Sequence, residues 1–478
     1  MTMIDRRGMM AGTAAAGLTA LLPSGATAAA VFPSKRPPKA QRRFTSPAVE
    51  AEIKRVKAKI ADPELAWLFE NCYPCTLDTT VKLGEIDGKP DAFVITGDIN
   101  ALWLRDSSAQ MQTYVHLASK DAGLRRVFHG LIQRQARCIL LDSYANAYME
   151  DPTAKSNLSA INDKTDMKPG VAERKWEIDS LCYTMRLAHG YWTATHDKAP
   201  FDALWAQGAA RAVATFREQQ RKDGPGPYHF QRVDPSPTET LMLKGYGAPT
   251  RKVGLIHSGF RPSDDACVLP FLIPSNLFAV SALKMLAQVH REARGDAAAA
   301  KDCLALAAEV QAALDAHGKM ADGNGGEVWA FEVDGFGNAI FMDDANVPSL
   351  SGLPLIGAAD RADPLFRRTA ALAWSNRNPY YFEGTAAHGI GGPHIGLDQI
   401  WPMSILTHAM NSDDDAVIRQ CLRWLKTTHA NTGFMHESFD KNDPMTFTRT
   451  WFAWANGLFG ELMLDLERRK PALLAERY

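Results

Sequence analysis

Apolar residues recur at three-to-four-residue spacing in long runs after residue 45, and loops rich in Gly, Pro, Asp and Asn separate these runs. This spacing places the apolar side chains along one face of an α-helix. The runs cover residues 107–118, 124–141, 178–195, 202–220, 275–293, 297–317, 363–373, 398–410, 413–428 and 450–466. Strand-like alternation is confined to short pieces such as 92–96 and 327–333. The sequence therefore predicts a single, mostly α-helical domain.

The number and order of these helices favour a closed ring. About a dozen helices that follow one another in pairs suggest a toroid of helical hairpins. Such a ring exposes a concave end that is built by the connecting loops, and loops are where binding and catalytic residues concentrate. We therefore expect the chemistry of this protein to lie in its loops.

The first thirty residues differ from the rest of the chain. Arg6 and Arg7 precede a short apolar run from Met9 to about Leu22, and small residues follow up to Ala30. A cationic start, an apolar middle and a small-residue cleavage site are typical of an export signal, here of the twin-arginine type. We expect residues 1–30 to be removed and the mature protein to be periplasmic or secreted.

The mature chain is expected to divide into a short lead and one large domain. Residues 31–45 are rich in Pro, Lys and Arg, which predicts a flexible lead, and residues 46–478 form the domain. No second apolar run reaches membrane-spanning length, so no membrane association is expected after removal of the signal. Lys and Arg total 53 against 54 Asp and Glu, and this near-neutral balance excludes nucleic acid as a partner.

The seven cysteines do not indicate a disulfide framework. They are scattered along the chain and their number is odd, so at least one cannot pair within the molecule. Cys72 and Cys75 have the C-x-x-C spacing of redox motifs, but no βαβ pattern surrounds them and no second pair completes a zinc site. A redox or structural role of this pair is a weak alternative.

Charged and aromatic residues gather in segments at or near predicted helix ends. One such cluster is usually a helix cap or a surface salt bridge. Several clusters that also contain tryptophan suggest one shared pocket. The segments are residues 97–108, 176–180, 259–265, 391–394 and 436–439.

At these segments the chain resembles glycoside hydrolase family 125, the exo-acting α-1,6-mannosidases. The resemblance covers essentially the whole mature chain. It implies an (α/α)6 barrel over residues 46–478, inversion at the anomeric carbon, and no need for a metal or cofactor. The implied substrate is a mannose-containing oligosaccharide that loses its non-reducing terminal α-1,6-linked mannose. The motifs that carry the resemblance are Asn71-Cys72-Tyr73-Pro74, Trp103-Leu104-Arg105-Asp106-Ser107-Ser108-Ala109-Gln110 and Phe447-Thr448-Arg449-Thr450-Trp451-Phe452-Ala453-Trp454-Ala455-Asn456.

Two carboxyl groups from distant segments meet the needs of inverting hydrolysis. The reaction requires a protonated carboxyl at the leaving oxygen and an ionised one, about 6.5 to 9.5 Å away, that activates water. The resemblance assigns the acid to Asp264 and the base to Glu437. Asp265 stays an alternative donor, and two adjacent carboxyl groups raise each other's proton affinity. Glu437 follows His436 without the second His of a zinc motif.

The remaining candidates are substrate-binding residues. An Arg beside a carboxylate, as in Arg105-Asp106, can hydrogen-bond vicinal sugar hydroxyls, although an internal ion pair that braces the loop is the alternative. Glu177 and Asp179 either hold the sugar or brace Arg105. Tryptophans offer flat apolar faces to a sugar ring but are more often core residues. The candidates for substrate binding are Trp103, Arg105, Asp106, Asp179, Arg261, Asp265, His394 and Trp401.

Two other functions stay open at this point. Another inverting exo-glycosidase on the same barrel, such as a glucoamylase-like enzyme, would share the paired acids. A secreted carbohydrate-binding protein that has lost catalysis would keep the aromatic residues and lose its acid. The presence of Asp264, Asp265 and Glu437 together argues against the second alternative.

Overall fold

The computed structural model describes residues 32–158, 163–233 and 237–478, and the expected export signal lies outside them. Residues from Ser34 to Tyr478 form one compact unit. Within the described residues, no helix is both long enough and apolar enough to cross a bilayer.

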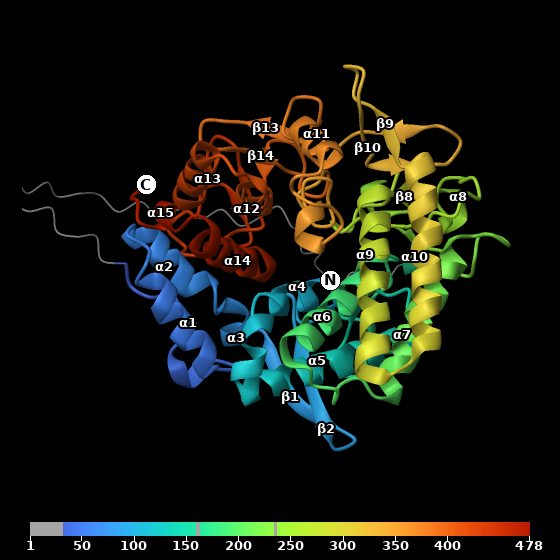
Figure 1. The fold of residues 1–478 in the computed structure, drawn as a ribbon, viewed down its shortest axis with the longest axis horizontal. Helices are drawn as coiled ribbons and strands as arrows, with labels where there is room; N and C mark the ends of the chain where they lie inside the picture. The colour runs from blue at the N-terminus through green and yellow to red at the C-terminus, as the bar shows by residue number, and fades with distance from the viewer. Residues whose placement is uncertain (1–31, 159–162, 234–236) are drawn as a thin grey trace, which may run out of the picture. The chain divides into compact units, whose positions relative to one another are not determined.

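Six helical segments form the inner wall of a barrel (Figure 1). Helix α4 packs against α6, α6 against α9, and α9 against η6, while α12 packs against α14, which returns to α4 and closes the ring. The inner segments are α4 (Leu104–Gln112), α6 (Ile178–Thr195), α9 (Ile273–Val289), η6 (Leu353–Ile356), α12 (Pro402–Asn411) and α14 (Ala453–Arg469).

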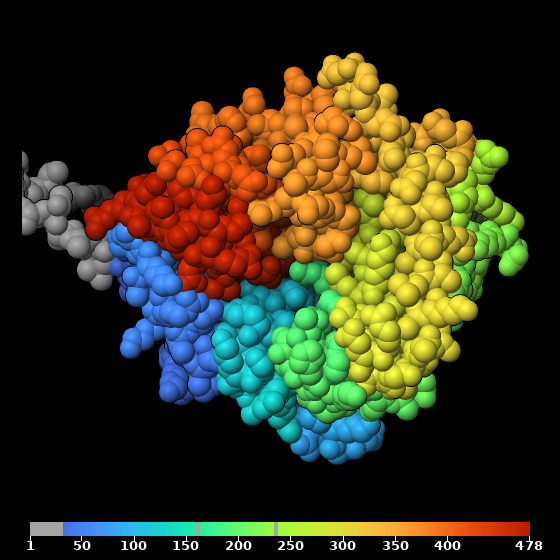
Figure 2. All heavy atoms as spheres, in the orientation of Figure 1, coloured from blue at the N-terminus to red at the C-terminus, as the bar shows by residue number. Residues whose placement is uncertain are grey.

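A second set of helices alternates with the inner set along the chain and covers it from outside. The ring closes where α14, red in Figure 2, packs against the blue helices α1 and α2. The arrangement is the predicted (α/α)6 barrel. The outer helices are α1 (Pro47–Lys57), α2 (Pro63–Cys72), α5 (Ala122–Leu141), α7 (Ala203–Gln219), α10 (Ala297–His317), α11 (Pro364–Ala373) and α13 (Asp415–Thr427).

The inner helices are buried on more of their surface than the outer helices, as two concentric layers require. Helix α9 is buried around most of its circumference, because it contacts both inner neighbours and α10. Helix α13 buries only a stripe of Ile418, Cys421, Leu422 and Leu425. An apolar stripe at i, i+3, i+4 and i+7 is the pattern of a helix with one face in water.

Short strands and helical turns fill the connections. Short strands lie directly before α4, α9 and α12, and the three-stranded sheets have the orders β3-β4-β6, β12-β11-β8 and β15-β16-β17. The strands are β1 (Val81–Ile86), β2 (Lys89–Val94), β3 (Leu102–Trp103), β4 (Ala147–Tyr148), β5 (Asp163–Lys164), β6 (Val171–Glu173), β7 (Gln231–Arg232), β8 (Phe271–Leu272), β9 (Lys319–Ala321), β10 (Glu327–Trp329), β11 (Glu332–Val333), β12 (Ala339–Ile340), β13 (Tyr381–Glu383), β14 (His388–Ile390), β15 (Gln399–Ile400), β16 (Ser438–Asp440) and β17 (Phe447–Thr448). The short helices are η1 (Lys39–Gln41), α3 (Cys75–Thr79), η2 (Val115–Lys120), η4 (Pro237–Glu239), α8 (Met242–Gly245), η5 (His290–Arg294) and α15 (Pro471–Leu474).

The segment expected to be a flexible lead makes specific contacts with the barrel. The Arg36 guanidinium donates to the buried Asp78 carboxylate at 2.7 Å and to Glu50 at 3.0 Å. The Phe44 amide donates to the Leu77 carbonyl at 3.0 Å. A buried carboxylate of the domain therefore takes its cation from the lead, while the boundary at residue 46 stays a prediction.

Candidate active site

The site lies where the first turns of the inner helices meet. Arg105, in the first turn of α4, donates to Asp179 in the first turn of α6, with an Nη1 to Oδ2 distance of 3.3 Å. Its Nη2 lies 3.4 Å from Oδ1 of Asp264, in the loop that leads to α9. These contacts place three consecutive inner helices with their N-terminal ends together, an arrangement that also favours negative charge there.

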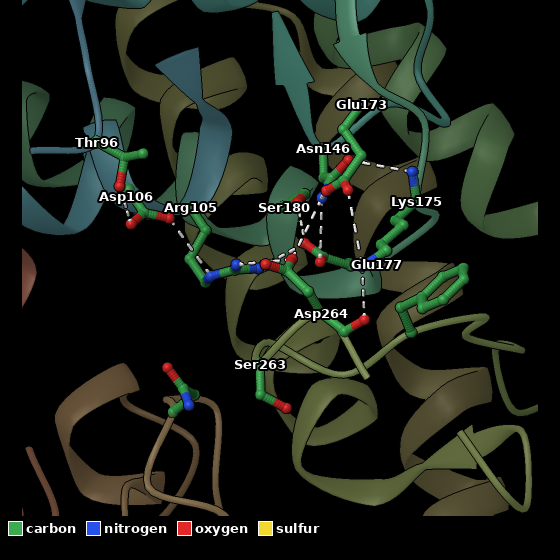
Figure 3. A network of polar contacts seen from close by, with 12 residues as sticks. Thr96, Arg105, Asp106, Asn146, Glu173, Lys175, Glu177, Ser180, Ser263 and Asp264 are labelled. Atoms are coloured by element: carbon green, nitrogen blue, oxygen red, sulfur yellow. Dashed lines mark hydrogen bonds and ion pairs between the residues drawn. The ribbon is translucent and has the colours of Figure 1, made fainter. Parts of the chain in front are cut away.

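Arg105 is the centre of a buried group of carboxylates (Figure 3). The guanidinium is 3% exposed and contacts Glu177 at 2.5 Å, in addition to Asp179 and Asp264. Asp106 completes the group at 3.6 Å from Nε. Glu177 and Asp179 both contact Arg105, as expected if these carboxylates brace the arginine rather than hold the sugar.

Two residues that the sequence reasoning missed hold Asp264 in place. The Lys175 ammonium, itself buried, donates to the main-chain carbonyl of Asp264 at 3.0 Å. The Asn146 amide lies 3.4 Å from the Asp264 carboxylate and 2.9 Å from Glu173. Asp264 has a φ of 69°, a left-handed conformation that is uncommon outside glycine and that the Lys175 contact stabilises.

The environment separates the pKa values of Asp264 and its neighbour Glu177. Burial alone raises the pKa of Asp264, but the Lys175 and Arg105 cations outweigh it and hold this pKa below its usual range. Burial raises the pKa of Glu177 well above its usual range, and the nearby carboxylates add to this effect against Arg105. The two carboxyl groups lie close together, since the Asn146 amide is 3.4 Å from each of them.

Asp265 points away from this group toward His394. Its Oδ1 lies 3.9 Å from His394 Nδ1, and its Oδ2 accepts from Ser263 at 3.2 Å. Burial raises the pKa of Asp265 to about 6, although His394 opposes the rise. The predicted pair of adjacent acids therefore faces two different environments.

Asp344 is a further carboxylate of this region that the sequence reasoning missed. It is fully buried, and its charge lies close enough to Asp265 to raise that pKa. A Cβ on Gly392 would lie 2.9 Å from its Oδ2, so the glycine allows a carboxylate to approach the backbone closely. In the sequence, the run of glycines before His394 was the signal that another group approaches the backbone closely there.

Glu437 comes from the segment between α13 and β16. It precedes β16, is 8% exposed, and accepts from Arg449 Nη1 at 3.2 Å. Arg449 also pairs with Asp98 and donates to the Thr96 carbonyl at 3.3 Å. The Thr96 hydroxyl in turn donates to Asp106. A continuous set of polar contacts therefore connects Glu437 with the Arg105 group.

The tryptophan and Arg261 candidates are more deeply buried than a sugar platform requires. Trp103 is 6% exposed and packs among small residues of the β3-β4-β6 sheet, and Trp401 is 2% exposed with its ring edge-on to Phe452. Arg261 donates to Glu332 at 2.6 Å and so braces the loop that carries Asp264. A role of these three side chains in binding stays a prediction.

Several residues of the candidate segments, and Asp344, carry buried polar atoms without a partner. Both hydrogen-bond donors and acceptors occur among them, which suits a ligand with many hydroxyl groups, because each hydroxyl donates and accepts. Among the described residues, such unpartnered atoms include Trp103 Nε1, Arg105 Nε, Asp179 Oδ1, Asp265 Oδ1, Asp344 Oδ2, Trp401 Nε1 and His436 Nε2.

Across the described part of the chain, no group of three or more His, Cys, Asp or Glu side chains is arranged to hold a metal ion. The positive charge next to the acids comes instead from Arg105, Lys175 and Arg449.

Comparison with solved structures agrees with the (α/α)6 barrel fold. A bacterial glucoamylase solved with acarbose shares the fold alone, with a TM-score of 0.51 at 12% identity over 90% of this chain and 58% of that one. A Streptococcus pneumoniae protein has a TM-score of 0.84 and 37% identity, over 88% of this chain and 99% of that one. It is described as one of a family of metal-independent α-mannosidases and was solved in a non-productive complex with α-1,6-mannobiose.

Sequence relatives point the same way. The meiotically up-regulated gene 157 protein of Schizosaccharomyces pombe is 43% identical over 461 residues, which cover 93% of this chain and 90% of that protein. The family model of the metal-independent α-mannosidases matches residues 62–464, nearly the whole barrel. The chain therefore belongs to glycoside hydrolase family 125, the metal-independent α-mannosidases.

Proposed function

We propose that this α-mannosidase is an exo-acting, inverting enzyme that releases non-reducing terminal α-1,6-linked mannose from mannose-containing oligosaccharides. The observation that carries the proposal is that Arg105 contacts Asp264 and Arg449 contacts Glu437, and that polar contacts through Thr96 connect these two pairs. The relative solved with α-1,6-mannobiose supports the linkage.

The two acids have different tasks in this mechanism. Asp264 donates a proton to the glycosidic oxygen, because its side chain is 24% exposed while the other carboxylates around Arg105 are almost fully buried. Glu437 accepts a proton from the attacking water, and Arg449 donates to its carboxylate at 3.2 Å and so holds it in place. Attack by water from the side opposite the leaving group inverts the anomeric carbon.

The unpartnered buried atoms account for binding. Asp179, Asp265 and Asp344 offer acceptors, whereas Arg105 Nε and the indole of Trp103 offer donors. A buried polar group that only the substrate can pair stays unpaired when a sugar lacks the matching hydroxyl. The binding of that sugar is therefore weaker. A site lined mainly by buried side chains suits the end of a glycan rather than the middle of one.

The stereochemistry of the first product tests the proposal. NMR of α-1,6-mannobiose during hydrolysis is expected to show β-mannose first, with α-mannose appearing later by mutarotation. Maltose is expected to stay intact under the same conditions. α-Mannose as the first product would make Glu437 a nucleophile of a retaining enzyme, and efficient cleavage of maltose would favour a glucoamylase-like specificity.

We also propose that the protein acts in the periplasm or outside the cell. The twin-arginine-like pattern over residues 1–30 supports this location. N-terminal sequencing of the protein from a periplasmic or secreted fraction is expected to give a start shortly after Ala30. Active protein with Met1 intact in the cytosol would contradict export.

A further inference from the structure

The buried carboxylates around Arg105 outnumber the cations that face them. Asp106, Glu177, Asp179 and Asp264 all contact this one guanidinium, and the other cation next to Asp264 is Lys175. An ionised carboxylate that is buried without a matching cation is costly, and such groups take up protons instead. At least one carboxyl of the group therefore keeps its proton near neutral pH.

The geometry points to the pair Glu177 and Asp264 as the holder of this proton. Shared contacts with Asn146 and Arg105 bring the two carboxyl groups together, and two carboxyl groups that share a hydrogen bond must hold a proton between them. The Asn146 amide lies 3.4 Å from both groups, and the guanidinium of Arg105 also contacts both. Figure 3 shows Glu177 and Asp264 facing one another between these two side chains.

The two members of the pair differ in access and in charge environment. Glu177 is fully buried and reaches no solvent, whereas the Asp264 side chain is 24% exposed. Lys175 and Arg105 favour the ionised form of Asp264 and lower its pKa, while the pKa of Glu177 is raised by burial and by its neighbours. Asp264 would thus be a poor acid if it stood alone, since it would lose its proton well below neutral pH.

We propose that Glu177 is the positioning residue that holds the proton for Asp264 and passes it on during hydrolysis. The proposal rests on the role of Asp264 as the acid. The proton moves from Glu177 to Asp264, which passes it to the glycosidic oxygen. The C1–O bond breaks, water bonds to C1, and Glu437 takes the proton of that water. Exchange with solvent then returns one proton to the pair and removes one from Glu437.

The surroundings of the pair come from several elements. They provide both signs of charge, so a substitution at Glu177 removes one carboxyl without removing the cations that act on Asp264. The charged and titratable groups next to the pair are Arg105, Asp106, Glu173, Lys175, Asp179, Tyr228, Arg232, Glu239, Asp265 and His394.

The pH dependence of Glu177→Gln tests the proposal. With wild-type enzyme and α-1,6-mannobiose, the alkaline limb of kcat/KM reports the loss of the proton from the pair. In Glu177→Gln only Asp264 remains to hold it, so this limb is expected to move by about one pH unit or more to lower pH. Above the shifted limb, kcat/KM is expected to fall by about tenfold for each unit of the shift. An aryl mannoside with a very good leaving group needs little protonation and is expected to lose much less.

Two further variants separate proton holding from structural support. Glu332→Gln is the matched control, because Glu332 is also a buried carboxylate that pairs with an arginine of the same loop but does not contact Asp264. Its alkaline limb is expected to stay where the wild-type limb lies. Ser180 donates to Glu177 at 2.8 Å, so Ser180→Ala disfavours ionised Glu177 and is expected to move the limb to higher pH. This variant tests the proposal even if Glu177→Gln does not fold.

The position of the alkaline limb in these variants decides whether Glu177 holds the proton. An unmoved limb in Glu177→Gln, or in Ser180→Ala where the first variant fails to fold, overturns the proposal. A loss in Glu177→Gln that is equal at all pH values and for both substrates does so too, because it indicates support alone. Failure of the acid assignment has a different signature: Asp264→Asn then shows no recovery on the activated substrate.

Discussion

Glu437→Gln and Asp264→Asn are each expected to lower kcat on a mannoside with a poor leaving group by about 10²- to 10⁴-fold, and by more where the water is also misplaced. Each substitution keeps the shape of the side chain and removes one proton-transfer step. Glu437→Gln leaves no group that accepts the proton of the water. Asp264→Asn leaves no group that donates to the glycosidic oxygen.

The two variants are expected to differ on an aryl mannoside with a very good leaving group. Such a leaving group departs without full protonation, so Asp264→Asn regains a large part of its rate. Glu437→Gln stays slow, because the water must still be activated. Steady-state kinetics on both substrates, with circular dichroism to verify folding, measures this difference.

Asp265→Asn is the matched comparison, since it removes the adjacent carboxyl. Asp265 faces His394 rather than Arg105, and we expect its loss to impair binding on both substrates alike. Recovery of Asp265→Asn, and not of Asp264→Asn, on the activated substrate would make Asp265 the donor. Equal recovery of the Asp264 and Glu437 variants would show that the acid and base assignments are wrong.

The ends of the outer helices could be predicted from the sequence better than those of the inner helices. Outer helices begin after side chains that accept their free amide hydrogens, as Asp121 does for α5 and Asp202 for α7. The inner helices α4, α9 and α12 begin after Trp103, Leu272 and Trp401, which cannot do so. Inner helices begin at the active site, where chemistry rather than capping selects the residues.

The start of the inner helix α9 was misplaced, and two capped outer helices were missed. Ser275, a residue of the N-cap type, was expected to begin α9, but the helix starts at Ile273 and Ser275 lies in its first turn. Helices α1 and α2 were missed, although Ser46-Pro47 and Asp62-Pro63 are caps followed by proline at the first helical position.

The candidate site was recognised through residues with unusual side chains in loops. This signal found Arg105 and Asp179, whose mutual contact the structure places at 3.3 Å. It could not find Lys175 or Asn146, since an isolated Lys or Asn is common on any surface. Their importance comes from burial next to Asp264, which depends on how distant segments pack.

Arg105→Met is expected to destabilise the protein by about 3–5 kcal/mol near neutral pH, because it removes the cation that three buried carboxylates and the partly exposed Asp264 share. Methionine fills much of the same volume, so the loss reports charge more than packing. Urea unfolding followed by circular dichroism measures it. Arg126→Met is the control, since Arg126 forms an exposed pair with Glu85, and a change within about 0.5 kcal/mol is expected there.

The destabilisation by Arg105→Met is expected to grow with pH. Burial already raises the pKa of Asp179 to about 6 and raises that of Glu177 further, and loss of the guanidinium raises both again. A carboxyl with a folded-state pKa above its unfolded value of about 4 stabilises the fold fully below pH 4. This contribution is lost as the pH rises through the folded-state pKa. The difference from wild type should therefore be smaller at pH 5 than at pH 8. A difference that is independent of pH, or below about 1 kcal/mol at pH 8, would mean that the carboxylates around Arg105 do not depend on it for their charge balance.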